Sequence, residues 1–81
     1  MERVSGRTDT EAHLGAVGRS IRARRLELDI SQEALANIAN IDRSHMGKIE
    51  RGERNVTLLN LVKIARALSC RPSDLLVAAG L

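Results

Sequence analysis

The chain has 81 residues, which favours a single domain, and its 13 Lys and Arg residues exceed its 10 Asp and Glu residues, giving a net charge of +3. It contains no Phe, Tyr or Trp, which disfavours binding of single-stranded nucleic acid by stacking bases on aromatic rings. One cysteine excludes an internal disulfide framework and agrees with a reducing cytosol, and no apolar stretch approaches the ~20 residues of a membrane-spanning helix.

The first residues are polar and precede the first helical pattern. Residues 1–7 are expected to form a flexible N-terminal tail, in which Arg3 and Arg7 either contact DNA or have no role. Thr8 and Glu11 have the spacing of a capping box, so one domain is predicted over residues 8–81, with a first helix from about 8 to 28. The apolar stripe of this helix comprises Leu14, Val17, Ile21 and Leu28, and Arg24 interrupts it. Asp29 follows the helix and can adopt the left-handed backbone that ends it.

Two short helical patterns separated by a break occupy residues 31–51. Ser31 and Asp42 belong to the residue types that cap helix N-termini, and Asn40 between them tolerates a left-handed backbone. Apolar residues follow each cap at helical spacing, namely Leu35, Ile38 and Ala39 in the first helix and Met46 and Ile49 in the second. The small Ala36 and the apolar Ile41 suit a steep angle between the two helices. The pattern predicts a helix-turn-helix unit.

The other side of the second helix carries a cationic face. Its members recur at helical spacing and are Arg43, Ser44, Gly47, Lys48 and Arg51. Three cations, a hydroxyl and a position without a side chain suit the approach of a polyanion. Gly47 either permits close contact with a base or sugar or is a tolerated surface glycine, which costs ~1 kcal/mol relative to Ala within a helix.

Two further helices are predicted after this unit. Gly52 is placed to end the preceding helix in a left-handed conformation, and Thr57 is placed to cap the next one. The core side of that helix is predicted to contain Leu58, Leu61, Ile64, Ala65 and Leu68. Pro72 suits the first turn of a last helix that contains Leu75, Leu76 and Ala79. Cys70 between them is interpreted as a small buried hydrophobe, with a reactive thiol as the alternative.

Residues Gln32 to Arg51 resemble the helix-turn-helix of the phage repressor and Cro-type (Xre-like) family. The matching features are Gln32, Leu35-Ala36, Ile41 and the run from Met46 to Gly52. The resemblance covers roughly Leu14 to Leu76, and the segment DRSHMGKIERGERNVTLLNL is similar to stand-alone controller proteins of restriction–modification systems. The resemblance implies an all-α fold, a compact five-helix bundle of the lambda-repressor-like DNA-binding type with a C-terminal dimerisation helix.

The resemblance also implies roles for individual residues. The residues that match base-contacting positions of the family are Arg43, Ser44, Gly47 and Lys48. Arg43 is expected to bind guanine, and Lys48 is expected to bind either guanine or a phosphate. Those expected at the DNA backbone are Gln32, His45, Arg51, Arg54, Asn55 and Thr57. For Arg51 and Arg54 a solvated charge is an equal alternative, and for His45 a half-buried spacer is the simpler interpretation.

Two structural roles follow from the same resemblance. Arg25 and Glu50 are expected to form a partly buried ion pair that orients the first helix against the third. The predicted dimer interface comprises Leu59, Val62, Leu76, Val77 and Leu81, although some of these side chains could instead complete the core of one subunit.

The function predicted from the sequence is that of a sequence-specific regulator of transcription that binds double-stranded DNA. A homodimer would place two recognition helices ~34 Å apart on a near-palindromic operator. A restriction–modification controller is one such regulator, and the alternatives are a DNA-binding antitoxin of a toxin–antitoxin pair and a protein-interaction module without DNA contact. No enzyme activity, cofactor, small-molecule effector or membrane association is expected, and His13, His45 and Cys70 lack metal-ligand spacing. A cytoplasmic, prokaryotic protein held at the nucleoid by its operator is expected.

Overall fold

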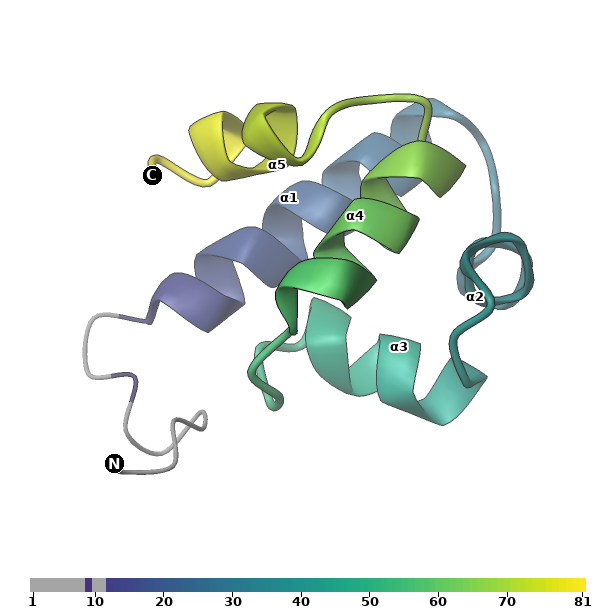
Figure 1. Ribbon diagram of the computed structural model, residues 1–81, viewed down its shortest axis with the longest axis horizontal. Coiled ribbons are helices and arrows are strands. Elements are labelled where there is room, and N and C mark those ends of the chain that lie inside the picture. Colours follow the sequence, from purple (N-terminus) through teal and green to yellow (C-terminus); the bar gives the residue numbers. More distant parts are fainter. Residues whose placement is uncertain (1–8, 10–11) are drawn as a thin grey trace.

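The computed structural model describes Asp9 and residues 12–81, and all regular structure in that part of the chain is α-helical (Figure 1). The five helices are α1 (His13–Glu27), α2 (Gln32–Ala39), α3 (Arg43–Glu50), α4 (Leu58–Ala67) and α5 (Pro72–Ala78). The predicted all-α, five-helix fold is confirmed. The expected tail at residues 1–7 and the expected capping pair of Thr8 and Glu11 lie outside the described residues. Over the described residues, no helix is both long and apolar enough to cross a membrane.

The helices pack so that α3 lies along one side of the molecule. It contacts α1 and α2, while α2 also packs against α4 and α5 packs against both α1 and α4 (Figure 1). The outer side of α3 is therefore left free of other helices, and its inner side is fixed by two neighbours. This arrangement is the predicted helix-turn-helix, with α2 and α3 as its two members.

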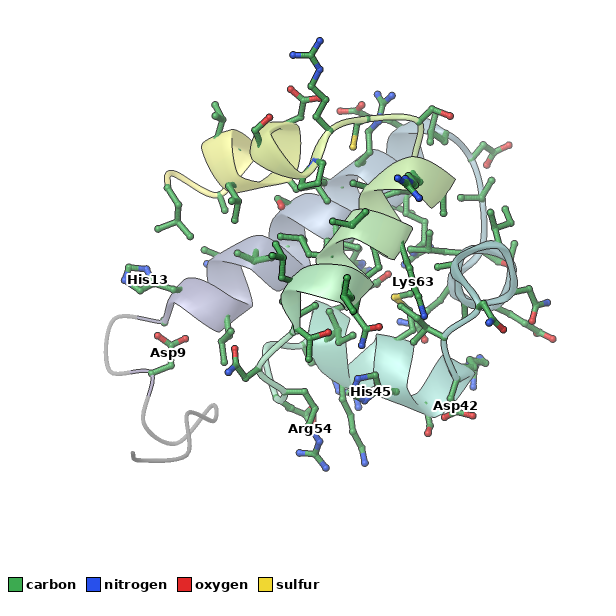
Figure 2. The ribbon with its side chains drawn as sticks, in the orientation of Figure 1. Asp9, His13, Asp42, His45, Arg54 and Lys63 are labelled. Carbon is green, nitrogen blue, oxygen red and sulfur yellow. The ribbon has the colours of Figure 1, made fainter. Side chains whose placement is uncertain are left out.

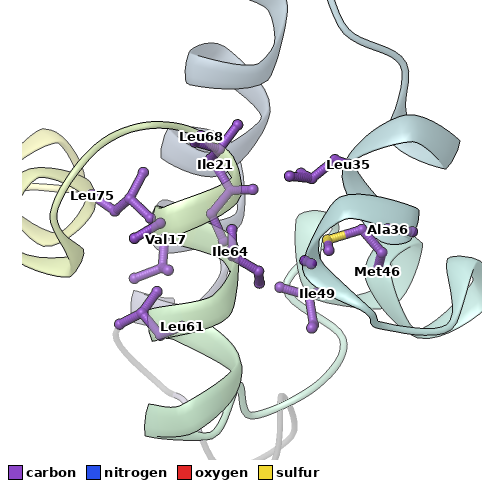
Figure 3. Packing of buried hydrophobic residues seen from close by; sticks show 12 residues of the cluster. Val17, Ile21, Leu35, Ala36, Met46, Ile49, Leu61, Ile64, Leu68 and Leu75 are labelled. Atoms are coloured by element: carbon purple, nitrogen blue, oxygen red, sulfur yellow. The ribbon is translucent and has the colours of Figure 1, made fainter.

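Side chains from all five helices meet in one apolar core (Figure 3). Its buried members are Val17, Ile21, Leu35, Ala36, Ala39, Met46, Ile49, Leu61, Ile64, Ala65, Leu68 and Leu75. The predicted position of Ile41 is confirmed, because it packs against this cluster and donates its N–H to the carbonyl of Ala36 at 2.9 Å. The short α2 and α3 thus owe their placement to core contacts, since isolated helices of eight residues are not stable in water.

Three residues predicted in apolar stripes are exposed instead. Leu28 is 37% exposed because α1 ends one residue before it. Ile38 is 61% exposed, since α2 turns Leu35, Ala36 and Ala39 inward and leaves Ile38 on its outer side. Leu58 is 73% exposed because it is the first residue of α4, almost one turn before the buried Leu61.

The predicted helix starts and left-handed positions after residue 28 are confirmed, although α5 ends at Ala78, one residue before the predicted Ala79. Ser31 Oγ accepts the N–H of Ala34 at 3.0 Å, and Thr57 Oγ1 accepts the N–H of Asn60 at 3.1 Å. Pro72 is the first residue of α5. The left-handed positions expected after α1, α2 and α3 are Asp29 (φ 56°), Asn40 (φ 55°) and Gly52 (φ 75°).

The start of α1 differs from the prediction by five residues. The helix begins at His13 because Ala12 adopts a left-handed conformation, with φ of 58°, that no helix continues through. Asp9 supplies the cap, since its carboxylate accepts the N–H of His13 at 2.9 Å and that of Leu14 at 2.6 Å. Both hydrogen bonds lower the pKa of Asp9, and the bond from Leu14 has the larger effect.

Polar contacts of α1 that the sequence did not predict fix it against α4 and α5. The buried Ser20 hydroxyl lies 2.9 Å from the carbonyl oxygen of Leu75 and 3.0 Å from that of Val17. Arg24 Nε donates to the carbonyl of Leu68, the C-cap of α4, at 3.2 Å. Arg24 interrupts the apolar stripe of α1 because its guanidinium binds a carbonyl group at the C-terminal end of α4.

Candidate nucleic-acid interface

The outer side of α3 presents cations to solvent beside the turn that precedes it. Arg43 and Ser44 are exposed and Lys48 is half-buried. Within the described part of the chain, the side chains of Arg43 and Lys48 form no hydrogen bond and no ion pair. In Figure 2, Asp42, His45 and Arg54 lie along the same lower edge of the molecule. Two cations without a protein partner are therefore available to an anionic ligand at this edge.

Asp42 caps α3 and also holds the side chain of Ser44. Its Oδ2 atom accepts the N–H of Ser44 at 3.1 Å, the N–H of His45 at 3.3 Å and the hydroxyl of Ser44 at 2.5 Å. The hydroxyl bond is the largest cause of the lowered pKa of Asp42. The predicted N-cap is confirmed, whereas the bond to the Ser44 hydroxyl was not predicted.

Gly47 is buried in the structure, so its interpretation as a surface glycine is wrong, whereas its predicted contact with a base stays a prediction. A Cβ atom at Gly47 would lie 3.1 Å from Arg51 Nη1 and 3.3 Å from Gln32 Oε1. The two long side chains therefore occupy the space that the missing side chain leaves. Gly47 makes room for Gln32 between α2 and α3, and a base could reach it only if these side chains moved.

The predicted ion pair of Arg25 and Glu50 is present and forms part of a larger network. Arg25 Nε lies 2.9 Å from Glu50 Oε2, and Nη2 lies 3.0 Å from Oε1. The pair is more deeply buried than expected, with side chains 10% and 3% exposed. Arg25 Nη1 also donates to the carbonyl of Ile30 at 3.1 Å. One arginine thus joins α1, the loop before α2 and the end of α3.

Gln32 is the third member of this network. Its Nε2 atom donates to Glu50 Oε1 at 3.3 Å, and the side chain is half-buried. The amide therefore points into the junction between α2 and α3. A phosphate could instead be bound by the backbone N–H groups in the first turn of α2, where Gln32 lies. The sequence indicated a backbone contact for Gln32 but gave no signal of its bond to Glu50.

The remaining predicted backbone contacts follow α3 along the chain. Arg51 is exposed and forms an ion pair with Glu53, and the Arg51 side chain lowers the pKa of that carboxyl. Arg54 and Asn55 are exposed, and Arg54 Nη1 donates to the carbonyl of Glu53 at 3.2 Å. Thr57 uses its hydroxyl oxygen to cap α4, and His45 is half-buried. Arg51, Arg54, Asn55 and Thr57 therefore lie at the C-terminal end of α3 and in the loop after it, whereas His45 lies in the first turn of α3.

The predicted dimer residues differ in exposure. Leu59 and Val77 are each 74% exposed and Leu81 is 55% exposed, so the core of one subunit does not use them. Val62 and Leu76 are half-buried, and Leu76 packs against the core. Leu76 therefore contributes at least part of its side chain to the core of its own subunit.

Cys70 lies at the edge of the apolar core. Cys70 is half-buried against the core, and desolvation raises the pKa of its thiol, so the thiolate that reactivity requires is disfavoured. This supports its interpretation as a small core residue. No group of three potential metal ligands occurs over residues 12–81 and Asp9.

Comparison with known proteins places this arrangement in a family. The family model described as helix-turn-helix matches residues 21–75. Control protein C.SmaI from Serratia marcescens is 42% identical over 62 residues, which are 76% of this chain and 74% of that protein. The crystal structure of the restriction–modification controller protein C.AhdI from Aeromonas hydrophila has 44% identity and a TM-score of 0.75, and the match covers 76% of this chain and 94% of that one.

A third relative has been solved together with DNA. The restriction–modification controller protein C.Esp1396I, in a tetramer in complex with its natural 35 base-pair operator, has 33% identity and a TM-score of 0.74. The match covers 83% of this chain and 92% of that one. Because the family model matches more than half of the chain and these relatives align over most of their own length, this chain belongs to the helix-turn-helix family, alongside restriction–modification controller proteins.

Proposed function

We propose that this protein is a sequence-specific regulator of transcription that binds double-stranded operator DNA as a homodimer, in the manner of a restriction–modification controller. The observation that carries the proposal is the outer side of α3, where the side chains of Arg43 and Lys48 form no hydrogen bond or ion pair within the described residues and Ser44 lies beside them. A helix of this kind fits the major groove, which is wide enough to admit an α-helix. The relative C.Esp1396I, whose structure contains its operator, supports the same assignment.

The free cations suggest how the contacts are divided. Arg43, at the first position of α3, is the residue best placed for a bidentate bond to guanine, worth ~1–3 kcal/mol of discrimination against other bases. Lys48 lies farther along α3 and contacts either guanine or a phosphate. Arg54, Asn55 and the N-terminal turn of α4 bind phosphates beyond α3, and the N-terminal turn of α2 binds them before it.

Dimer formation is proposed because one α3 covers only a few base pairs. Leu59 on α4, Val77 on α5 and Leu81 beyond α5 are apolar and exposed. Burying them against a second copy would remove apolar surface from water, which favours association. Two copies would then present two α3 helices, and the operator would be a near-palindrome with half-sites about one helical turn apart.

Selection of bound duplexes from a random DNA pool tests this function. We expect a near-palindromic sequence whose affinity falls steeply as the salt concentration rises, because bound phosphates release counterions. Arg43→Ala should relax the base preference at one position per half-site, whereas Arg54→Ala, at a proposed phosphate contact, should weaken binding to all sequences about equally.

Arg66→Ala is the matched control, since it removes the same charge from an exposed position on α4. We expect it to leave the selected sequence unchanged. Selection of no sequence by a protein that is dimeric at the assay concentration would contradict the proposed function. An unchanged preference in Arg43→Ala would contradict the role of Arg43 alone.

A further inference from the structure

The hydroxyl of Ser44 is already used as a donor in the free protein. Ser44 Oγ lies 2.5 Å from Asp42 Oδ2. An ionised carboxylate can only accept hydrogen bonds, so the hydroxyl hydrogen must point toward Asp42. Asp42 is ionised at neutral pH because an ordinary aspartate pKa lies far below 7, and the hydrogen bonds from Ser44 and His45 lower its pKa further. Ser44 Oγ therefore offers only its lone pairs to a ligand.

The acceptor itself is fixed by the fold. Asp42 Oδ2 also accepts the backbone N–H groups of Ser44 and His45, at 3.1 and 3.3 Å, as the N-cap of α3. These N–H groups have no partner within the helix, so we expect the carboxylate to stay on them when DNA binds. The direction of the Ser44 hydroxyl therefore follows from helix capping. It does not depend on the ligand.

We propose that Asp42 determines the base preference of Ser44, restricting it to a base that carries an amino group in the major groove. Adenine and cytosine present such donors, at N6 and N4, whereas guanine presents N7 and O6 and thymine presents O4, all of which are acceptors. A serine hydroxyl without Asp42 could bind either kind, or a phosphate. With Asp42 in place, an acceptor on a base would face a lone pair of Ser44 Oγ, which is unfavourable. A phosphate would be repelled by the two negatively charged oxygens of the Asp42 carboxylate. This inference rests on the proposed function.

The assignment gives the operator a chemical pattern at one end of α3. Arg43 and Ser44 are the first two residues of α3 and both are exposed, so we expect them to contact neighbouring base pairs. Arg43 selects guanine because it carries only donors, and Ser44 selects adenine or cytosine because it can only accept. The two residues therefore have opposite requirements, and the adjacent positions of each half-site should differ accordingly.

Selection from a random duplex pool with three further variants tests the role of Asp42. Ser44→Ala identifies the position that the hydroxyl contacts. Asp42→Gly removes the carboxylate, and Gly at an N-cap costs only a few tenths of a kcal/mol. Ser31→Gly is the matched control, because it removes the side-chain cap of α2, which accepts the N–H of Ala34, and leaves α3 unchanged. Circular dichroism verifies that each variant is folded.

The wild type should prefer adenine or cytosine about 5- to 10-fold at the position that Ser44→Ala identifies, the size of one base-specific hydrogen bond. Asp42→Gly should reduce this preference to less than about 2-fold by admitting guanine and thymine, while the position read by Arg43 is unchanged. Ser31→Gly should keep the full preference. A wild-type preference for guanine or thymine there would overturn the inference, as would an unchanged preference in Asp42→Gly or an equal loss for all sequences in Ser44→Ala.

Base analogues in the operator provide a second readout, which compares binding by only two proteins, the wild type and Ser44→Ala. Replacing the preferred adenine by purine, which lacks only the 6-amino group, or the preferred cytosine by 2-pyrimidinone, which lacks the 4-amino group, should weaken wild-type binding about 5- to 10-fold. The same replacement should not weaken binding by Ser44→Ala. Equal loss in both proteins, or none in the wild type, would overturn the inference.

The outcomes separate this inference from the proposed function. If the wild type selects no operator, the proposed function has failed. If it selects a near-palindrome but Ser44→Ala and Asp42→Gly leave that selection unchanged, the regulator assignment stands and the role of Asp42 is rejected.

Discussion

Single polar residues of the helix-turn-helix each satisfy more than one requirement. Asp42 caps α3 and binds the Ser44 hydroxyl, and Glu50 accepts from both Arg25 and Gln32. Arg25 in turn donates to Ile30 in the loop before α2. The backbone of α3, which carries the cationic face, is therefore held by buried and capping bonds, and this reduces the entropy lost when a ligand orders that helix.

Removing one member of the buried pair should be costly. Arg25→Ala leaves the Glu50 carboxylate with 3% exposure and without its cation, so we expect the free energy of unfolding to fall by about 3 kcal/mol or more. Arg22→Ala, an exposed arginine on the same helix, is the control and should change it by less than about 0.5 kcal/mol. Urea unfolding at one fixed protein concentration gives both values. Equal effects of the two substitutions would show that the pair is not needed for stability.

At the scale of elements, the position of α1 on α3 depends on a close approach of two backbones. A Cβ atom at Gly18 would lie 2.4 Å from the carbonyl oxygen of Glu50 and 2.6 Å from that of Ile49. Real Cβ atoms do not approach oxygen so closely, and backbone atoms cannot rotate away. Glycine at this position is what allows α1 to lie close enough for Arg25 to reach Glu50.

Gly18→Ala should therefore separate α1 from α3. We expect a loss of about 2 kcal/mol in the free energy of unfolding, the usual size of an overpacking defect. Gly15→Ala is a matched control in the same helix, since its Cβ would meet only the mobile Arg19 side chain at 3.3 Å and should gain up to about 1 kcal/mol from helix propensity. Thermal unfolding of both variants compares them. A Gly18→Ala protein as stable as Gly15→Ala would contradict this account of the contact.

At the scale of the whole molecule, apolar side chains remain on the surface after the core is complete. Leu59 and Val77 are the most exposed of these, at 74% each, followed by Leu58 at 73% and Ile38 at 61%. Small domains gain little stability from their own cores, and association is a common remedy. Leu59 and Val77 belong to the surface proposed for the dimer, whereas Ile38 lies on the outer side of α2.

Charge placed on the two surfaces should have different effects. Leu59→Asp would bury an unpaired carboxylate in the proposed dimer, so we expect its dissociation constant to rise by at least about 100-fold while the helical content is unchanged. Ile38→Asp is the control and should leave the dimer intact. Sedimentation equilibrium measures both proteins. A dimer that survives Leu59→Asp but not Ile38→Asp would move the interface to α2.

The local structure of the helix-turn-helix was determined by the sequence itself. Caps and helix ends depend on the residue type at one position, and Ser31, Asp42, Thr57, Asn40 and Gly52 each took the predicted conformation. The cationic positions of α3 followed from helical spacing in the same way. The ion pair of Arg25 and Glu50 was implied by family resemblance, which carries the tertiary contact that spacing alone does not.

Tertiary structure alone decided what lies between the helices. The exposure of Ile38 and Leu58, the burial of Gly47 under Gln32 and Arg51, and the contact of Gly18 with Glu50 depend on where a second helix lies. The hydrogen bonds of Ser20 and Arg24 join residues 55 and 44 positions apart, and no local pattern indicates their partners. Residue type and spacing fix the backbone over one or two helical turns, whereas the partner of a side chain is fixed only when distant segments pack.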